Sequence, residues 1–195
     1  MSSGRAARFA CSLIFLLAAA SFCLAEEPAK EPGIVKLVGD KQGSGVVLYR
    51  EIGPGGEDHI ILTANHVMPK DTTTIDGATA TIIARDTDAD LALVRVKLPK
   101  QRQMHWYPPK WLDPVGKARL FGFLGGTYTS QDCTVDEKGD LSCKVEAGGS
   151  GGPLFKDGYV VGILTRYHGV ATAPQIRAFL GKHNYLAVFE PKEPK

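Results

Sequence analysis

Short apolar runs separated by turn-forming residues follow one another along the chain from residue 34 onward. Each run is four to eight residues long, rich in Val, Ile and Leu, and bounded by Gly, Pro, Asp or Asn. Regularly spaced strands of this length predict an all-β protein, built as a sandwich or as a pair of barrels. The runs occupy residues 34–38, 44–49, 59–64, 80–85, 91–96, 118–123, 140–145 and 159–165.

One late segment, TAPQIRAFLGKH, has the spacing of a helix instead of a strand. Ile176, Phe179 and Leu180 recur at intervals that bring them to one face, and Pro174 lies near the start, where helices tolerate it. The pattern predicts a helix at about 173–182 that packs this face on the strands.

The predicted strands fall into two sets of similar size, at about 34–98 and about 115–170. A connection rich in Pro and Lys, 97–114, separates them. We expect a single domain of two lobes over 34–186. The remaining residues, 187–195, end in EPKEPK and have the composition of a disordered tail.

The first 25 residues have a different character. An arginine-containing start precedes an uncharged run at 9–25, which predicts a secretory signal peptide followed by a flexible leader at 26–33. An uncleaved membrane anchor is the alternative, since the run of seventeen residues comes close to the length that spans a bilayer. A lipid anchor on Cys23 is disfavoured by the bulky Phe22 before it. We therefore expect a secreted or periplasmic protein.

The charge of the mature chain argues against two classes of partner. Loss of Arg5 and Arg8 with the signal peptide leaves 21 basic and 21 acidic residues, a net charge of zero. A protein that binds nucleic acid or a membrane surface normally carries a basic excess. We expect neither partner, and the motifs present call for no cofactor and no metal.

Signal removal also leaves only two cysteines, Cys133 and Cys143. In an oxidising compartment they predict a disulfide that staples the hairpin CTVDEKGDLSC. A zinc site is the alternative, and it is disfavoured because no histidine lies near the pair.

Three polar residues lie at the ends of predicted strands or in a predicted turn, where a catalytic side chain could be placed. His66 ends the apolar run ILTANH, Asp90 directly precedes LALVRV, and Ser150 lies between two pairs of glycines in GGSGG. Taken alone, each has a structural explanation as a strand-end or turn residue, and Asp86 and Asp88 share that explanation. Together they give the chain order His, Asp, Ser, which is one of the known orders of a serine-protease triad.

The chemistry needs these residue types. A serine hydroxyl is a weak nucleophile without a neighbouring base, an imidazole accepts and returns a proton near neutral pH, and a carboxylate orients and stabilises the imidazole. The glycines around Ser150 permit a turn in which the amides of Gly148 and Ser150 converge on one point as an oxyanion hole.

The segments ILTANHV, DADLALVRV and GGSGGPLF resemble the three signature blocks of trypsin-like serine proteases. SGVVL, VVGILT and GVATAPQIRAFL are similar to flanking segments of the bacterial HtrA/Deg protease domain, here without a PDZ domain. The resemblance covers most of residues 34–183. It implies a chymotrypsin-like fold, in which two six-stranded antiparallel β-barrels enclose the active site and a C-terminal helix follows.

The same resemblance implies a serine endopeptidase that acts on proteins or peptides through an acyl-enzyme, with His66, Asp90 and Ser150 as catalytic residues. It further implies a substrate pocket between residues 144–148 and 165–167. Tyr167 would narrow that pocket and favour small or medium apolar side chains. If Lys144 or Arg166 turned inward, the pocket would instead favour acidic side chains. The third possibility is that both basic residues face solvent. The implied substrate-binding residues are Lys144, Val145, Thr165, Arg166 and Tyr167.

One departure from the family pattern is Gly149, where many members have Asp or Asn. Without that carboxylate, activation by insertion of a new N-terminus is not expected. A glycine there also predicts a flexible loop. This departure motivates a second hypothesis, a non-catalytic or self-inhibited protein that keeps the protease fold for binding.

Overall fold

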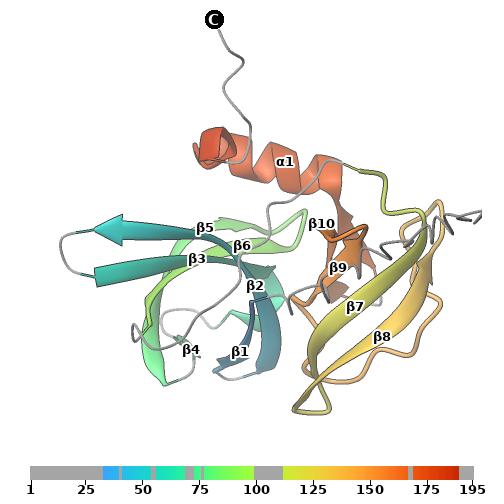
Figure 1. Ribbon diagram of the computed structural model, residues 1–195, viewed down its shortest axis with the longest axis horizontal. Helices are drawn as coiled ribbons and strands as arrows, with labels where there is room; N and C mark the ends of the chain where they lie inside the picture. Colours follow the sequence, from blue (N-terminus) through green and yellow to red (C-terminus); the bar gives the residue numbers. More distant parts are fainter. Residues whose placement is uncertain are drawn as a thin grey trace, which may run out of the picture.

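The computed structural model describes residues 33–39, 41–53, 56–68, 73–75, 77–98, 112–166 and 169–188. They form two β-rich lobes side by side with a helix lying over both (Figure 1). The expected all-β fold with a C-terminal helix is confirmed. The predicted signal peptide, the leader up to residue 32 and most of the connection between the lobes lie outside the described residues.

The first lobe is a closed antiparallel barrel. Its strands follow the order β1-β2-β3-β6-β5-β4, and β4 pairs with β1 to complete the ring. The strands are β1 (Ile34–Val38), β2 (Gln42–Gly53), β3 (Gly56–Ala64), β4 (Thr73–Ile75), β5 (Ala78–Asp86) and β6 (Leu91–Lys97).

The continuous apolar runs of this lobe reflect burial on both faces of its strands. Val47 and Ile61 belong to the cluster that fills the barrel. Their neighbours Val46 and Leu62 point the other way, into a second cluster shared with the other lobe and the helix. Because successive side chains alternate between faces, a strand buried on both sides needs an unbroken apolar sequence.

The second lobe contains a five-stranded antiparallel sheet in the order β11-β10-β9-β7-β8. It therefore has five strands where six were expected, and the run at 140–145 is not one of them. The strands are β7 (Gly116–Leu124), β8 (Thr127–Val135), β9 (Pro153–Lys156), β10 (Tyr159–Leu164) and β11 (Val170–Thr172).

Isolated bridges replace the missing strand. Leu141 pairs with Val135 at the end of β8, and Asp140 pairs with Gly169 next to β11. The edges of the sheet are thus connected through two residues. Beyond this point the Ser142 amide still donates to the Thr134 carbonyl at 2.9 Å, but a side chain takes the place of the return bond of a regular ladder. The Ser142 hydroxyl accepts a hydrogen bond from the Thr134 amide at 2.8 Å.

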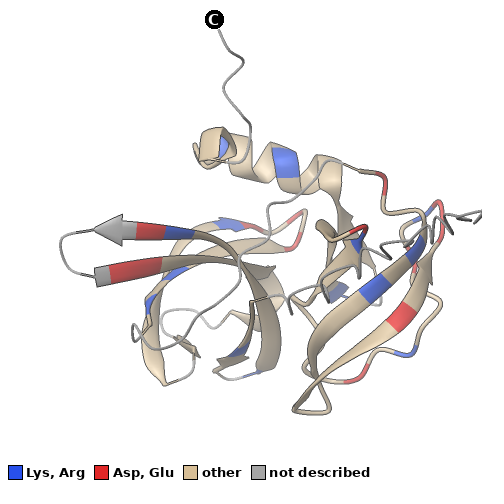
Figure 2. Ribbon diagram, in the orientation of Figure 1, with Lys and Arg blue, Asp and Glu red and all other residues tan. Residues whose placement is uncertain are grey.

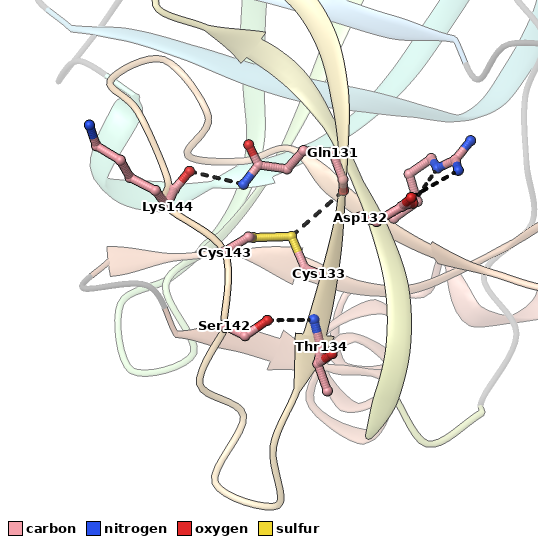
Figure 3. The surroundings of a disulfide bond; sticks show 8 residues. Gln131, Asp132, Cys133, Thr134, Ser142, Cys143 and Lys144 are labelled. Atoms are coloured by element: carbon pink, nitrogen blue, oxygen red, sulfur yellow. Dashed lines mark hydrogen bonds and ion pairs between the residues drawn. A yellow bond between two sulfur atoms is a disulfide. The ribbon is translucent and has the colours of Figure 1, made fainter.

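The predicted disulfide between Cys133 and Cys143 is present, with the two Cα atoms 5.1 Å apart (Figure 3). It joins β8 to the segment that leads toward Ser150. On the same segment the Gln131 side-chain amide donates to the Lys144 carbonyl at 2.9 Å. The disulfide and these side-chain bonds hold the segment against β8.

Replacement of both Cys133 and Cys143 by alanine is expected to lower the free energy of unfolding by about 3 kcal/mol, from the closure entropy of so short a loop. The melting temperature should fall by roughly 6–11 °C for a domain of this size. Thermal unfolding with and without a thiol reductant measures the effect, and the double variant, which has no disulfide to lose, is the control for the reductant. An unchanged melting temperature after verified reduction would contradict the expected role.

Four strands had no counterpart among the predicted runs: β4, β8, β9 and β11. Strand β8, TYTSQDCTV, is polar and exposed over most of its length and lies at an edge of the sheet. It is held by backbone pairing with β7, from Gly116 opposite Val135 to Leu124 opposite Thr127. A pattern of apolar residues cannot reveal a strand that buries so few of them.

The helix α1 spans Ala173–Lys182 and buries Ile176, Phe179 and Leu180, the face expected from the sequence. These side chains join residues of both lobes in one cluster. At the N-terminus the Gln175 side chain accepts a hydrogen bond from the Thr172 amide at 2.8 Å, which satisfies one of the free end groups. A short 3-10 turn, η3 (Leu186–Val188), follows where a disordered tail was expected to begin.

Basic and acidic residues are interspersed over both lobes (Figure 2). On neighbouring strands β7 and β8, for example, Arg119 lies 2.7 Å from Asp132. No helix among the described residues has the length and apolar character needed to cross a bilayer.

Candidate active site

His66 and Asp90 form a close pair at one end of the first barrel. Strand β3 ends at Ala64, and a 3-10 turn, η1 (Asn65–Val67), presents His66. The His66 Nδ1 atom lies 2.7 Å from Asp90 Oδ2, while Asp90 Oδ1 accepts the His66 backbone amide at 2.9 Å. The side chains are 12% and 13% exposed, so the pair is largely screened from solvent.

Asp90 reaches this position through an unusual backbone conformation. Its φ is +53°, a left-handed value that aspartate adopts more readily than most residues. The preceding turn is held by Asp86, whose Oδ1 accepts the amides of Asp88 at 3.0 Å and Ala89 at 2.9 Å. Of the three candidate aspartates, Asp90 is therefore the one that contacts His66, and Asp86 has a turn-forming role.

The carboxylate of Asp90 is stabilised in its ionised form. Burial opposes ionisation, but the hydrogen bond from the His66 ring, the ring's charge and the amides of His66 and Arg166 together outweigh it, so the pKa of Asp90 lies below its ordinary value. The Arg166 amide is 3.2 Å from Asp90 Oδ2. The resulting stabilisation is present above the carboxyl's unfolded pKa and is lost as the pH falls through the lower folded value.

This pairing also defines which side of the imidazole is available. An ionised carboxylate is an acceptor only, so the neutral His66 ring carries its proton on Nδ1, facing Asp90. Nε2 then has a free lone pair. An imidazole held in this tautomer can accept a proton from a hydroxyl group.

Ser150 lies in a loop of the second lobe that is packed directly on the first. The Ser150 carbonyl accepts the Ser44 amide at 2.8 Å. A Cβ on the next residue, Gly151, would overlap the Ser44 carbonyl oxygen and the Thr63 hydroxyl, and would lie 3.0 Å from the Ala64 amide nitrogen. The loop is therefore brought against the end of β3, beside η1. In the described part of the chain the Ser150 hydroxyl forms no hydrogen bond with His66.

The backbone carbonyls of residues 147–150 are all occupied. Those of Ala147, Gly149 and Ser150 accept amides of Gly125 at 2.9 Å, Gly152 at 2.8 Å and Ser44 at 2.8 Å. The Gly148 carbonyl accepts the Ser44 hydroxyl at 2.7 Å. Between residues 148 and 152 only two amides have no acceptor among the described residues, those of Gly148 and Ser150. These are the two donors that the sequence predicts for an oxyanion hole.

The direction of the Gly148 amide follows from the geometry of the peptide. Because a trans peptide is planar, its N–H points opposite to its carbonyl. The Gly125 amide holds the Ala147 carbonyl, so the Gly148 N–H must point away from Gly125. Gly148 completes this turn with a φ of +92°, which is accessible to glycine at little cost. The Glu146 carbonyl closes the turn by accepting the Gly149 amide at 3.1 Å.

Gly149 is enclosed, and this differs from the flexible loop expected from the sequence. A Cβ at this position would lie 2.5 Å from Leu124 Cδ2 and 3.1 Å from Val145 Cγ1. Apolar side chains thus occupy the space that an aspartate would need. A larger residue at 149 would require the Leu124 side chain to move.

The residues predicted to bind substrate lie on two segments near this loop. Lys144 is exposed, Val145 is half-buried next to Gly149, and Arg166 is exposed. The Thr165 hydroxyl donates to the Gly169 carbonyl at 2.9 Å, which continues the β10–β11 pairing to a tight turn. Tyr167 lies outside the described residues. Within the described ranges, no cluster of His, Cys, Asp and Glu side chains could hold a metal ion.

The sequence did not identify the residues that contact the site from segments far away along the chain. Arg85 donates to the Asn65 side-chain oxygen at 3.0 Å and so braces the turn that carries His66. Ser44 and Gly125 hold the loop around Ser150, as described above. A weak signal existed for Ser44, a hydroxyl residue between two glycines at the start of an apolar strand. Nothing in the sequence marks Gly125 as a supporting residue, because it acts only through its backbone amide, which contacts the Ala147 carbonyl.

Comparison with known proteins shows the family and the fold. Residues 43–163 match the family described as trypsin-like peptidase domain. The fold is also similar to that of the Rv3671c protease, in a crystal structure of its inactive form. The TM-score is 0.60 at 22% sequence identity, and the match covers 82% of this chain and 94% of that protein. No curated protein sequence shows significant similarity to the chain. The family match includes His66, Asp90 and Ser150 and spans most of both lobes, and the chain therefore belongs to the trypsin-like peptidase domain family.

Proposed function

We propose that the protein is a serine endopeptidase in which Ser150 is the nucleophile, His66 the general base and Asp90 its orienting partner. The observation that carries the proposal is the loop at Ser150. The carbonyls of residues 147–150 are bonded, and the amides of Gly148 and Ser150 have no acceptor among the described residues, next to a His66–Asp90 pair 2.7 Å apart. A structural loop has no need of two unpaired donors beside a hydroxyl, because buried amides are normally bonded.

The proposed reaction is acyl transfer. Ser150 Oγ attacks the carbonyl carbon of the scissile peptide while its proton passes to His66 Nε2. Asp90 stabilises the imidazolium, and the amides of Gly148 and Ser150 stabilise the negative charge on the carbonyl oxygen. The imidazolium then protonates the leaving amine. A water molecule next attacks the carbonyl carbon of the acyl-enzyme while giving a proton to His66; the bond to Ser150 Oγ breaks, His66 returns the proton to Oγ, and the carboxylic acid product leaves. The lack of a hydrogen bond between Ser150 and His66 among the described residues is compatible with a free enzyme, where such hydrogen bonds often form fully only on binding substrate.

We propose that substrates are proteins or peptides bound between Lys144 and Val145 on one side and Thr165 and Arg166 on the other. The exposed Lys144 and Arg166 support a pocket whose charged groups face solvent. Export from the cytoplasm is part of the proposal, and the disulfide supports it because cytosolic thiols are kept reduced.

A fluorophosphonate probe tests the proposal directly. It phosphonylates a serine only where a base activates it, so folded protein should be labelled at Ser150 and nowhere else, as located by peptide mass spectrometry. Labelling should disappear after heat denaturation. Failure of the folded protein to react, while a control serine protease labels fully in the same mixture, would favour the alternative of a binding protein without turnover.

A further inference from the structure

We infer that Ser44 is a positioning residue for the oxyanion hole, acting on Gly148 from the opposite lobe. The inference rests on the proposed function and adds to it a residue outside the triad. Ser44 lies near the start of β2 and is completely buried. A buried hydroxyl requires hydrogen-bond partners.

The Ser44 hydroxyl connects three segments that are far apart in the sequence. It donates to the Gly148 carbonyl at 2.7 Å and accepts the Phe123 amide at 2.8 Å. Phe123 belongs to β7 and Gly148 to the loop of Ser150. Both roles of the hydroxyl, donor and acceptor, are therefore used for backbone groups of the second lobe.

The backbone of Ser44 contacts the same loop. Its amide donates to the Ser150 carbonyl at 2.8 Å, and its own carbonyl accepts the Thr63 hydroxyl at 2.7 Å. One residue thus holds the Gly148 and Ser150 carbonyls. The two amides proposed as oxyanion-hole donors belong to these same two residues.

The hydroxyl holds the carbonyl end of the peptide between Gly148 and Gly149, while the N–H of the same peptide donates to the Glu146 carbonyl at 3.1 Å. The Gly125 amide holds the peptide before Gly148, and Ser44 holds the one after it. Without the hydroxyl, the Gly148 carbonyl and the Phe123 amide would be buried without partners, which is costly enough to drive a rotation of the peptide. Such a rotation would change the angle between the Gly148 and Ser150 N–H groups, which must converge on one oxygen atom.

The Ser44 hydroxyl reaches the second lobe because the neighbouring residue there, Gly122, has no side chain. A Cβ at Gly122 would lie 2.9 Å from Ser44 Oγ and 3.6 Å from the Gly149 Cα. The absence of a side chain at Gly122 allows β2, β7 and the Ser150 loop to meet at the hydroxyl.

The test is peptide cleavage by Ser44→Ala, measured well below the melting temperature and expressed per mole of folded protein. Because its backbone amide still holds Ser150, the nucleophile should stay in place while the oxyanion hole loses its alignment. We expect kcat to fall by about 10²-fold, as for other small displacements of catalytic groups, with KM nearly unchanged. The inhibition constant of a peptide aldehyde, whose adduct places an oxyanion in the hole, should rise by the same factor as kcat/KM falls.

Two further variants separate positioning from folding. Thr73→Val removes another buried hydroxyl, one that donates to the Val38 carbonyl at 3.3 Å in the first barrel, and should leave kcat unchanged. Ser44→Cys fills the same space with a weak donor and covers the case in which the alanine variant does not fold. It should lower kcat with KM preserved.

A wild-type kcat and aldehyde affinity in the folded fraction of Ser44→Ala or Ser44→Cys would overturn the inference. That outcome differs from failure of the proposed function, in which the wild-type protein itself would neither cleave peptides nor react with the fluorophosphonate.

Discussion

Replacing Ser150 with alanine is expected to lower kcat for peptide hydrolysis by about 10⁶-fold, the loss typical of removing the nucleophile from a serine protease. The variant removes one oxygen atom and leaves the bonds of the loop in place, because Ser150 contacts Ser44 through its carbonyl. Folding should therefore be intact. The measurement is hydrolysis of a fluorogenic peptide library by matched amounts of folded wild-type and variant protein.

Ser130→Ala is the matched control, since Ser130 is an exposed serine on β8. It should retain full activity. Residual activity of Ser150→Ala within tenfold of the wild type would show that another group performs the cleavage, and it would remove Ser150 from the proposed mechanism.

Replacing Asp90 with asparagine is expected to lower kcat by about 10⁴-fold with the fold intact. The asparagine side chain can donate to His66 Nδ1, which shifts the imidazole proton to Nε2. In that tautomer His66 cannot accept the proton of Ser150. The measurement is the rate of hydrolysis at neutral pH, accompanied by a circular dichroism spectrum and a melting curve.

Asp88→Asn is the control for this substitution, because Asp88 is exposed and contacts Asp86 only through its backbone amide. Near-normal hydrolysis by Asp90→Asn, or an equal loss in both variants, would contradict the assignment of Asp90 as the orienting residue.

The bracing of the Ser150 loop bears on how activity would be controlled. The carbonyls of Ala147 and Gly148 are held by Gly125 and Ser44, and Leu124 fills the space beside Gly149. The residues that make these contacts lie inside the two lobes, so the contacts do not depend on cleavage near the N-terminus. They support the expectation that a newly cleaved N-terminus is not needed to form the oxyanion hole.

The local pattern of apolar residues was sufficient to predict most of the strands and the helix. Runs such as those around Val47 and Ile61 identify strands because burial demands apolar side chains, and the spacing of Ile176, Phe179 and Leu180 identifies the helix. The polar edge strand β8 was missed because backbone pairing rather than burial holds it. The run at 140–145 was predicted as a strand but forms only isolated bridges, and the disulfide and side-chain bonds complete its attachment to β8.

The sequence by itself determined the residue types of the site, since His66, Asp90 and the glycines around Ser150 are each recognisable in their own short segment. Only the tertiary structure decided that Gly149 is enclosed by Leu124 and that Ser44 and Gly125 hold the loop. The physical reason is that these are contacts between segments distant along the chain, or between backbone atoms. Such contacts leave no periodicity in the sequence, because any residue can supply a backbone group and only the fold brings it into place.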